Sequence, residues 1–136
     1  MQRLKLVIIL LSLLFSLNQS FAYEPTLSYQ GDLRNAIGRP INENLPLTFR
    51  FYDSIESTTL LWEENHENVE IREGRFTVNL GIYSEITVAI AQSPELYLGI
   101  SVARGREFTP RMKVTSTLRA LWAEVANQAS VSDHAL

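Results

Sequence analysis

Regular alternation of apolar and polar side chains is the main structural signal along this chain. Every second residue is apolar in the segments 45–51, 76–80 and 96–102, and most of the residues between them are polar. Successive side chains of a β-strand point to opposite faces, so this pattern predicts strands that turn one face to a core and the other to water. The predicted core residues are Leu47, Phe49, Phe51, Trp62, Phe76, Val78, Leu98 and Ile100.

A further strand is predicted near the start of the domain, where Leu27, Tyr29 and Leu33 share one parity. Gly31 falls in the same inward-facing set, and a glycine there marks a bulge or the close approach of another backbone. Turn-forming residues follow at 35–40. They predict a short connection to the next strand.

Residues 60–71 predict a less regular strand, because Trp62 and Val69 lie on opposite parities. A β-bulge inserts one extra residue into one strand of a pair, and a bulge within 65–68 would bring both ends onto the same face. The turn sequence at 72–74 leads directly into the following strand. It predicts that these two strands form a hairpin.

The C-terminal part of the chain changes from a period of two to a helical period. Alternation is lost at 84–94, which fits either a strand or a short helical piece. Apolar residues then recur at i, i+3, i+4 and i+7, which predicts an amphipathic helix over about 117–126. Its stripe packs on the domain's own sheet or docks a partner. The stripe consists of Leu118, Leu121, Trp122 and Val125.

The first residues predict export. Arg3 and Lys5 precede an apolar run at 6–17, which is shorter than the roughly 20 residues that a membrane-spanning helix needs. Small residues at Ser20 and Ala22 predict signal-peptide cleavage after Ala22. The expected organisation is therefore a signal peptide at 1–22, a β-sandwich domain at 23–114, and a helix with a frayed tail at 115–136, with no membrane span after cleavage.

Charge and composition narrow the function classes. Two of the 12 Lys and Arg residues lie in the predicted signal, whereas all 15 Asp and Glu residues follow it, so the processed chain carries a net charge of −5. Nucleic acid is an unfavourable partner for such a chain. The chain has no cysteine, which excludes disulfides, thiolate metal ligands and thiol nucleophiles. No cofactor or metal is expected.

Several sequence motifs occur in a fixed order along the chain. They are LSYQGDL at 27–33, GRPIN at 38–42, LTFRFYD at 47–53, LWEE at 61–64, GRFTVNLG at 74–81, LYLGI at 96–100 and TPR at 109–111. Their order resembles the N-terminal β-domain of bacterial tail-fibre-like surface proteins, which often carry a C-terminal chaperone-of-endosialidase domain. The resemblance covers about 27–124, without the stalk or the chaperone domain. It implies an exported structural or adhesive module and brings no catalytic residues with it.

Candidate contact residues lie on the polar parity of the strands and in one basic loop. Tyr52 and Tyr97 occupy outward positions of predicted strands and would form an exposed aromatic pair on one sheet. The basic cluster either binds an anionic glycan or pairs with local carboxylates. It consists of Arg104, Arg106, Arg111 and Lys113.

The acidic run in the less regular strand has two interpretations. Carboxylates close together bind calcium, but no calcium-loop sequence accompanies these, so a solvated hairpin is favoured. His66 is interpreted as a solvated strand residue rather than a general base, and His134 lies in the predicted tail. The acidic residues are Glu63, Glu64, Glu67, Glu70 and Glu73.

Together these patterns predict a mainly β chain, an antiparallel β-sandwich of about six or seven strands with a short C-terminal helix. The expected function is that of an exported, non-catalytic structural or adhesion module, which acts through protein contacts or self-association. The alternative is a carbohydrate- or surface-polymer-binding domain that uses Tyr52, Tyr97 and the basic loop.

Overall fold

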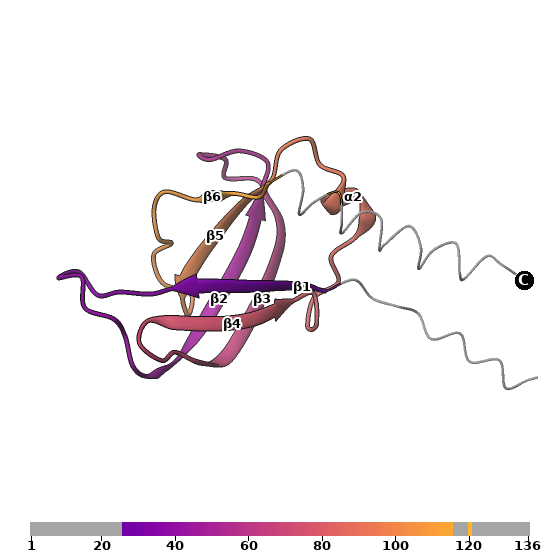
Figure 1. Cartoon of the computed structure of the whole chain (residues 1–136). Coiled ribbons are helices and arrows are strands. Elements are labelled where there is room, and N and C mark those ends of the chain that lie inside the picture. The colour runs from indigo at the N-terminus through magenta and orange to yellow at the C-terminus, as the bar shows by residue number, and fades with distance from the viewer. Residues whose placement is uncertain (1–25, 116–119, 121–136) are drawn as a thin grey trace, which may run out of the picture.

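The protein is mainly β, as the sequence predicts. The computed structural model describes residues 26–115 and 120. The predicted signal peptide at 1–22 and the predicted helix stripe of Leu118, Leu121, Trp122 and Val125 lie outside these residues. In order, the described elements are β1 (Leu27–Asp32), β2 (Asn44–Tyr52), β3 (Leu60–Glu70), β4 (Arg75–Leu80), α2 (Val88–Ala91), β5 (Tyr97–Val102) and β6 (Met112–Lys113) (Figure 1).

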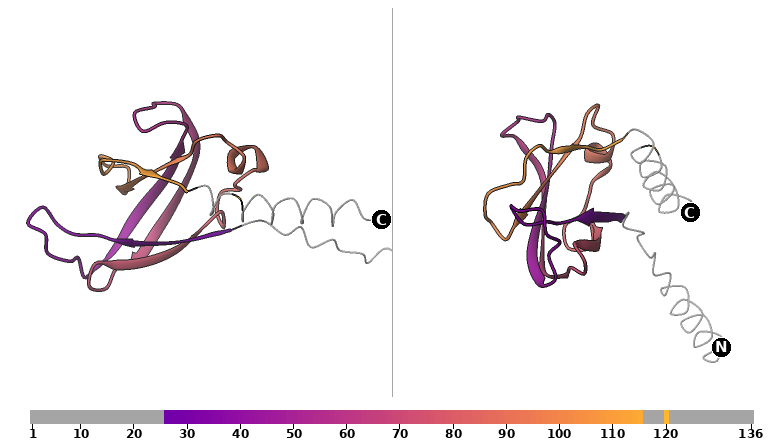
Figure 2. Two further views of the ribbon diagram at one scale, coloured as in Figure 1. Left: turned by 45° about the horizontal axis from the view of Figure 1, so that its top comes forward. Right: turned by 60° about the vertical axis from the view of Figure 1, so that its left-hand side comes forward.

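The strands form two antiparallel sheets. One has four strands in the order β3-β2-β5-β6, and the other consists of β1 and β4. The two-stranded sheet runs across β2 and β3 rather than beside them (Figure 2). Phe49 of β2 lies opposite both Glu64 of β3 and Ile100 of β5, so β2 is an interior strand of the larger sheet.

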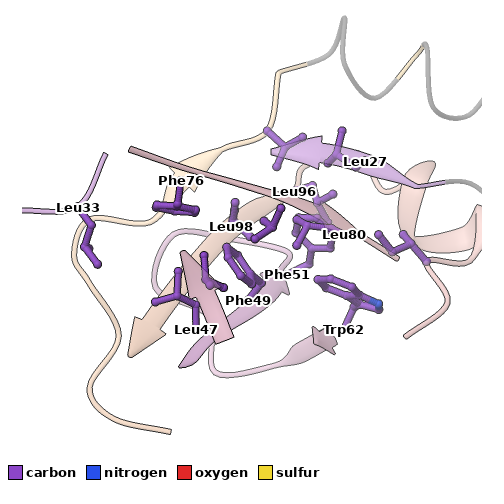
Figure 3. Close-up of a cluster of buried hydrophobic side chains, with 14 of the residues drawn as sticks. Leu27, Leu33, Leu47, Phe49, Phe51, Trp62, Phe76, Leu80, Leu96 and Leu98 are labelled. Carbon is purple, nitrogen blue, oxygen red and sulfur yellow. The ribbon is translucent and has the colours of Figure 1, made fainter. Parts of the chain in front are cut away.

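One apolar cluster joins the inner faces of both sheets (Figure 3). The Phe49 ring centroid lies 6.1 Å from that of Tyr29 and 6.3 Å from that of Phe76, which links β2 to β1 and β4. Trp62 stacks on Phe51 with ring centroids 4.8 Å apart, so its predicted place in the core is confirmed. The other predicted core residues are also in this cluster, with Ile100 only half-buried at its border.

The predicted bulge is present in β3. Leu45 lies opposite Val69, whereas Leu47 lies opposite His66, so β3 has one more residue than β2 in this interval. The extra residue lies at 67–68, within the predicted interval. It brings His66 and Val69 onto the buried side of the strand although they are an odd number of residues apart.

The predicted hairpin between β3 and β4 is wrong beyond its turn. Arg72 and Arg75 form a single antiparallel bridge, with N-to-O distances of 3.0 and 2.8 Å, but β4 then pairs with β1. Glu73 and Gly74 both have positive φ, 49° and 81°. This tight turn sends the chain from one sheet into the other.

Local chemistry explains two further features. Gly31 faces the Phe76 ring so closely that an added Cβ would overlap it, so the predicted close approach is that of a side chain and not of a backbone. The segment 84–94, for which the sequence fits either a strand or a short helical piece, contains the short helix α2, with Thr87 as its N-cap.

Within the described part of the chain, no helix has the length and apolar character needed to cross a membrane.

Candidate functional site

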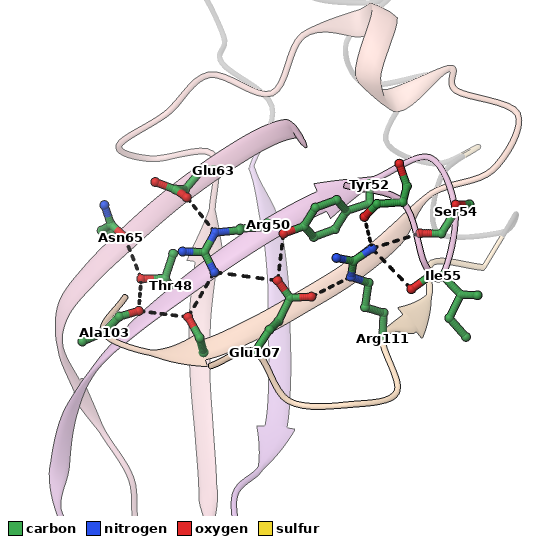
Figure 4. A network of polar contacts seen from close by, with 12 residues as sticks. Thr48, Arg50, Tyr52, Ser54, Ile55, Glu63, Asn65, Ala103, Glu107 and Arg111 are labelled. Atoms are coloured by element: carbon green, nitrogen blue, oxygen red, sulfur yellow. Dashed lines mark hydrogen bonds and ion pairs between the residues drawn. The ribbon is translucent and has the colours of Figure 1, made fainter. Parts of the chain in front are cut away.

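A polar network covers the outer face of the four-stranded sheet (Figure 4). Arg50, on β2, donates from Nε to Glu63 Oε2 at 2.7 Å and from Nη1 to Ser101 Oγ at 3.1 Å. The same Nη1 lies 3.7 Å from Glu107 Oε2. Arg50 therefore joins β3, β5 and the loop after β5.

Tyr52 lies beneath this loop instead of being exposed, so the prediction of an exposed aromatic pair is wrong. The side chain of Tyr52 donates from its hydroxyl to Glu107 Oε2 at 2.8 Å, and the Arg111 guanidinium carbon lies 3.4 Å above its ring centroid. Burial, reinforced by the hydrogen bond and charge of Glu107, raises the pKa of Tyr52. Gly99 permits this arrangement, because a Cβ there would overlap the Glu107 carboxylate.

Arg111 binds the loop after β5 to the β2–β3 connection. Its Nε donates to Glu107 Oε1 at 2.6 Å, and its Nη1 donates to the Ser57 carbonyl at 2.6 Å. Arg50 and Arg111 thus share the Glu107 carboxylate. The network is internally neutralised and holds two loops on the sheet.

The remaining predicted contact residues do not form one surface patch around Tyr52. Tyr97 lies directly opposite Tyr52 on β5 and is half-buried. Lys113 lies 5.8 Å above the Tyr97 ring and pairs with Glu95 at 2.7 Å, so pairing with local carboxylates is confirmed for Lys113 as for Arg111. Arg104 and Arg106 are exposed in the turn after β5.

Glu64 is a buried carboxylate, and its interpretation as part of a solvated acidic run is wrong. Its Oε2 accepts the backbone N–H groups of Gly81, Tyr83 and Ser84 at 2.9, 3.1 and 2.9 Å. A buried charge needs such partners. The available sequence signal was its parity, because Glu64 lies two residues from the buried Trp62 on the same strand.

His66 is also buried, with 8% of its surface exposed, so its interpretation as a solvated residue is wrong. Its Nε2 lies 2.6 Å from Glu64 Oε1, and the rings of Phe49 and Tyr83 contact it edge-on at 5.4 and 5.1 Å. A carboxylate only accepts hydrogen bonds, so this contact places a ring proton on Nε2, and in the neutral imidazole the lone pair is then on Nδ1.

A cavity of about 560 Å³ opens between β3 and β4 beside this pair. Its polar lining comes from both strands and the turn that joins them. Across residues 26–115 and 120, no three His, Asp or Glu side chains are grouped as a metal site requires. The lining residues are His66, Asn68, Val69, Glu70, Arg72, Arg75, Phe76, Thr77, Val78, Asn79 and Ile82.

A second cavity, of about 290 Å³, follows the edge of β1 that does not pair with β4. One wall contains the successive residues Gly31, Asp32 and Leu33. Leu98 and Ile100 of β5 lie on the other side, with the partly exposed Phe108 and Met112 at the rim. This edge of β1 thus borders an apolar groove.

Two antiparallel sheets with a shared apolar core define a small, mainly β domain. Residues 28–111 match the model of a domain of unknown function, DUF8740, and the chain belongs to that family. Comparison with curated proteins found no match, and comparison with solved structures found none either.

Proposed function

We propose that this protein is an exported, non-catalytic interaction module of a surface or tail-fibre-like protein, and that it acts through protein–protein contacts in the periplasm, at the cell surface or outside the cell. In this proposal the two sheets are the layers of an antiparallel β-sandwich. The basic N-terminal start and apolar run support export, and the ordered motifs of the sequence support the tail-fibre-like class.

The edge of β1 that faces away from β4, which pairs with no strand within residues 26–115, is the observation that carries this proposal. Natural sheets protect their edges with charged residues. β3 carries several glutamates and β4 begins at Arg75, whereas β1 is uncharged from Leu27 to Gly31. A protein with an unprotected strand edge beside an apolar groove can bind an extended segment of another protein as an additional strand. Backbone hydrogen bonds along the edge then provide affinity, and the groove accommodates every second side chain of the added strand.

The polar groups elsewhere support a non-catalytic role. Glu107 is shared between Arg50 and Arg111, so its charge is neutralised within the protein. His66 is bonded to Glu64, and within the described residues no hydroxyl is hydrogen-bonded to its ring. A nucleophile activated by this histidine would need that contact.

Site-specific photocrosslinking tests the proposal. A photoreactive benzoylphenylalanine at Phe108 of the full chain, expressed in its native envelope, is expected to give one defined protein adduct. Introducing lysine at Ser28 and Gln30 should abolish the adduct while leaving the melting temperature unchanged, because both side chains are exposed and charge blocks strand addition.

The matched control adds the same charge elsewhere, as Thr58→Lys with Thr59→Lys in the exposed connection between β2 and β3. This variant should keep the adduct. Equal crosslinking in all variants would show that the β1 edge is not the contact, and the absence of any adduct would contradict the proposed function.

A further inference from the structure

The cavity between β3 and β4 is a slot that follows both strands. The turn at Glu73 and Gly74 joins the two strands, and the hydrogen bond from Gly81 N–H to Glu64 connects the end of β4 to β3. Between them, 68–70 of β3 and 75–79 of β4 line the space without a break, so residues of both parities border it. Its volume of about 560 Å³ is within the range of small-molecule sites.

His66 is the buried polar side chain among the residues that line this slot. It lines the cavity, is more than nine-tenths buried, and is held in one orientation by Glu64. Since Nε2 donates to the carboxylate, the neutral imidazole has its lone pair on Nδ1, and no hydrogen-bond partner for Nδ1 lies among the described residues. A buried acceptor of this kind requires a donor, such as a hydroxyl group.

The rim supplies donors and one positive charge. Arg72 pairs with Glu70 at 2.7 Å, whereas the Arg75 guanidinium has no ion-pair partner within 26–115. Thr77 and Asn79 add a hydroxyl and an amide from the same strand. Phe76 and Val69 provide an apolar floor.

We propose that this slot binds an acidic sugar unit, whose hydroxyl donates to His66 Nδ1 and whose carboxylate accepts from Arg75. A sugar combines hydroxyl groups with an apolar ring face, which matches the polar rim and apolar floor. The site is separate from the β1 edge, so this proposal goes beyond the proposed protein-contact function and can succeed or fail independently of it.

Nitrogen NMR of the imidazole rings in the full chain is the direct test, with glucuronate as the probe. His134→Gln leaves His66 as the one imidazole to observe. Saturable binding should move the His66 Nδ1 resonance and leave Nε2 less affected. Glucose should bind about tenfold or more weakly, because it lacks the carboxylate that pairs with Arg75.

Variants of the rim distinguish a built site from general anion binding. Arg75→Gln should weaken glucuronate binding about tenfold, while Arg39→Gln, at an exposed arginine outside the cavity, should not change it. Thr77→Val keeps the shape of an exposed residue and should also weaken binding. These variants leave the buried pair untouched, so folding is preserved.

Three outcomes would overturn the proposal. Acetate shifting Nδ1 as strongly as glucuronate would show simple anion binding at Arg75. Equal affinities for glucose and glucuronate would overturn the acidic class of ligand, and an unchanged Nδ1 resonance with every probe would remove the site. Loss of photocrosslinking at β1 would affect none of these results.

Discussion

At the scale of single residues, Glu64 is the side chain whose partners most restrict what can replace it. Three backbone N–H groups converge on Oε2, and His66 occupies Oε1. Glutamine retains one acceptor for the N–H groups but presents an NH₂ donor to His66. We therefore expect Glu64→Gln to move the His66 proton from Nε2 to Nδ1, because Nε2 must then accept.

The same substitution is expected to lower the free energy of unfolding by about 1–3 kcal/mol, since hydrogen bonds to a charged acceptor become neutral ones. Urea denaturation measures the loss, and imidazole nitrogen NMR measures the tautomer. Glu63→Gln is the matched control, because Glu63 is only partly buried and pairs with Arg50 on the opposite face. An unchanged His66 tautomer in Glu64→Gln would contradict the assigned network.

Residue identity and strand parity gave conflicting predictions at these positions. Glu64 and His66 are polar, which favours solvent, but they share the parity of Trp62, which favours the core. Parity prevailed because the loop at 81–84 supplies the N–H donors that a buried carboxylate needs. Those donors are distant in sequence, so local pattern could not reveal them.

At the scale of elements, the turn at Glu73 and Gly74 decides how the two sheets connect. Both residues have positive φ, the conformation of a two-residue turn that prefers Asn followed by Gly. Glu73→Asn should raise the free energy of unfolding by about 0.5–1 kcal/mol by relieving this backbone strain. Chemical denaturation of the full chain measures the change.

Gly74→Ala, at the neighbouring residue, is expected to destabilise the protein, whereas Glu73→Asn is expected to stabilise it. A Cβ at Gly74 would lie 2.6 Å from Asp32 Oδ1 and 3.1 Å from the Leu33 carbonyl oxygen, with φ at 81°. We expect Gly74→Ala to lower the free energy of unfolding by about 1–3 kcal/mol. If Glu73→Asn were destabilising, or Gly74→Ala neutral, the turn would not have the geometry described.

Element positions followed largely from sequence, whereas element pairing did not. Alternation located β2, β4 and β5, and opposite parities located the bulge in β3. The turn at 72–74 correctly indicated a reversal, but a turn reports only local geometry. Whether β4 continues beside β3 depends on β1, which pairs with β4 through all six of its residues.

At the scale of the whole molecule, the inner and outer faces of the larger sheet are stabilised differently. The inner face is an apolar cluster shared with β1 and β4, and it could be predicted from alternation. The outer face is covered by a loop, where Glu107 and Arg111 lie over Tyr52. Sequence placed Tyr52 outward correctly but could not show that the loop would cover it.

Burial of two phenol groups makes the stability of the molecule sensitive to high pH. Burial raises the pKa of Tyr29, and burial together with Glu107 raises that of Tyr52. In the unfolded chain both phenols lose their protons near about pH 10. Above that pH the unfolded state binds fewer protons than the folded state, so the free energy of unfolding falls as pH rises, whereas near neutral pH these two groups add no pH dependence.

Tyr52→Phe separates the two contributions of this hydroxyl. At neutral pH the variant should be less stable by about 1–2 kcal/mol, because the hydrogen bond to Glu107 is lost. Above about pH 10 its free energy of unfolding should fall less steeply than that of the wild type, since one shifted phenol is absent. Urea denaturation across this pH range measures both effects.

Tyr29→Phe is the informative comparison, because the Tyr29 hydroxyl contacts only Met112 Sδ, at 3.9 Å, among the described residues. This substitution should change the free energy of unfolding little at neutral pH. It should still make that free energy fall less steeply at alkaline pH, since burial alone raises the pKa of Tyr29. Identical alkaline slopes in the wild type and Tyr52→Phe would mean that the loop does not cover Tyr52 in solution. The outer face would then be open, and the aromatic pair with Tyr97 would again be a candidate contact surface.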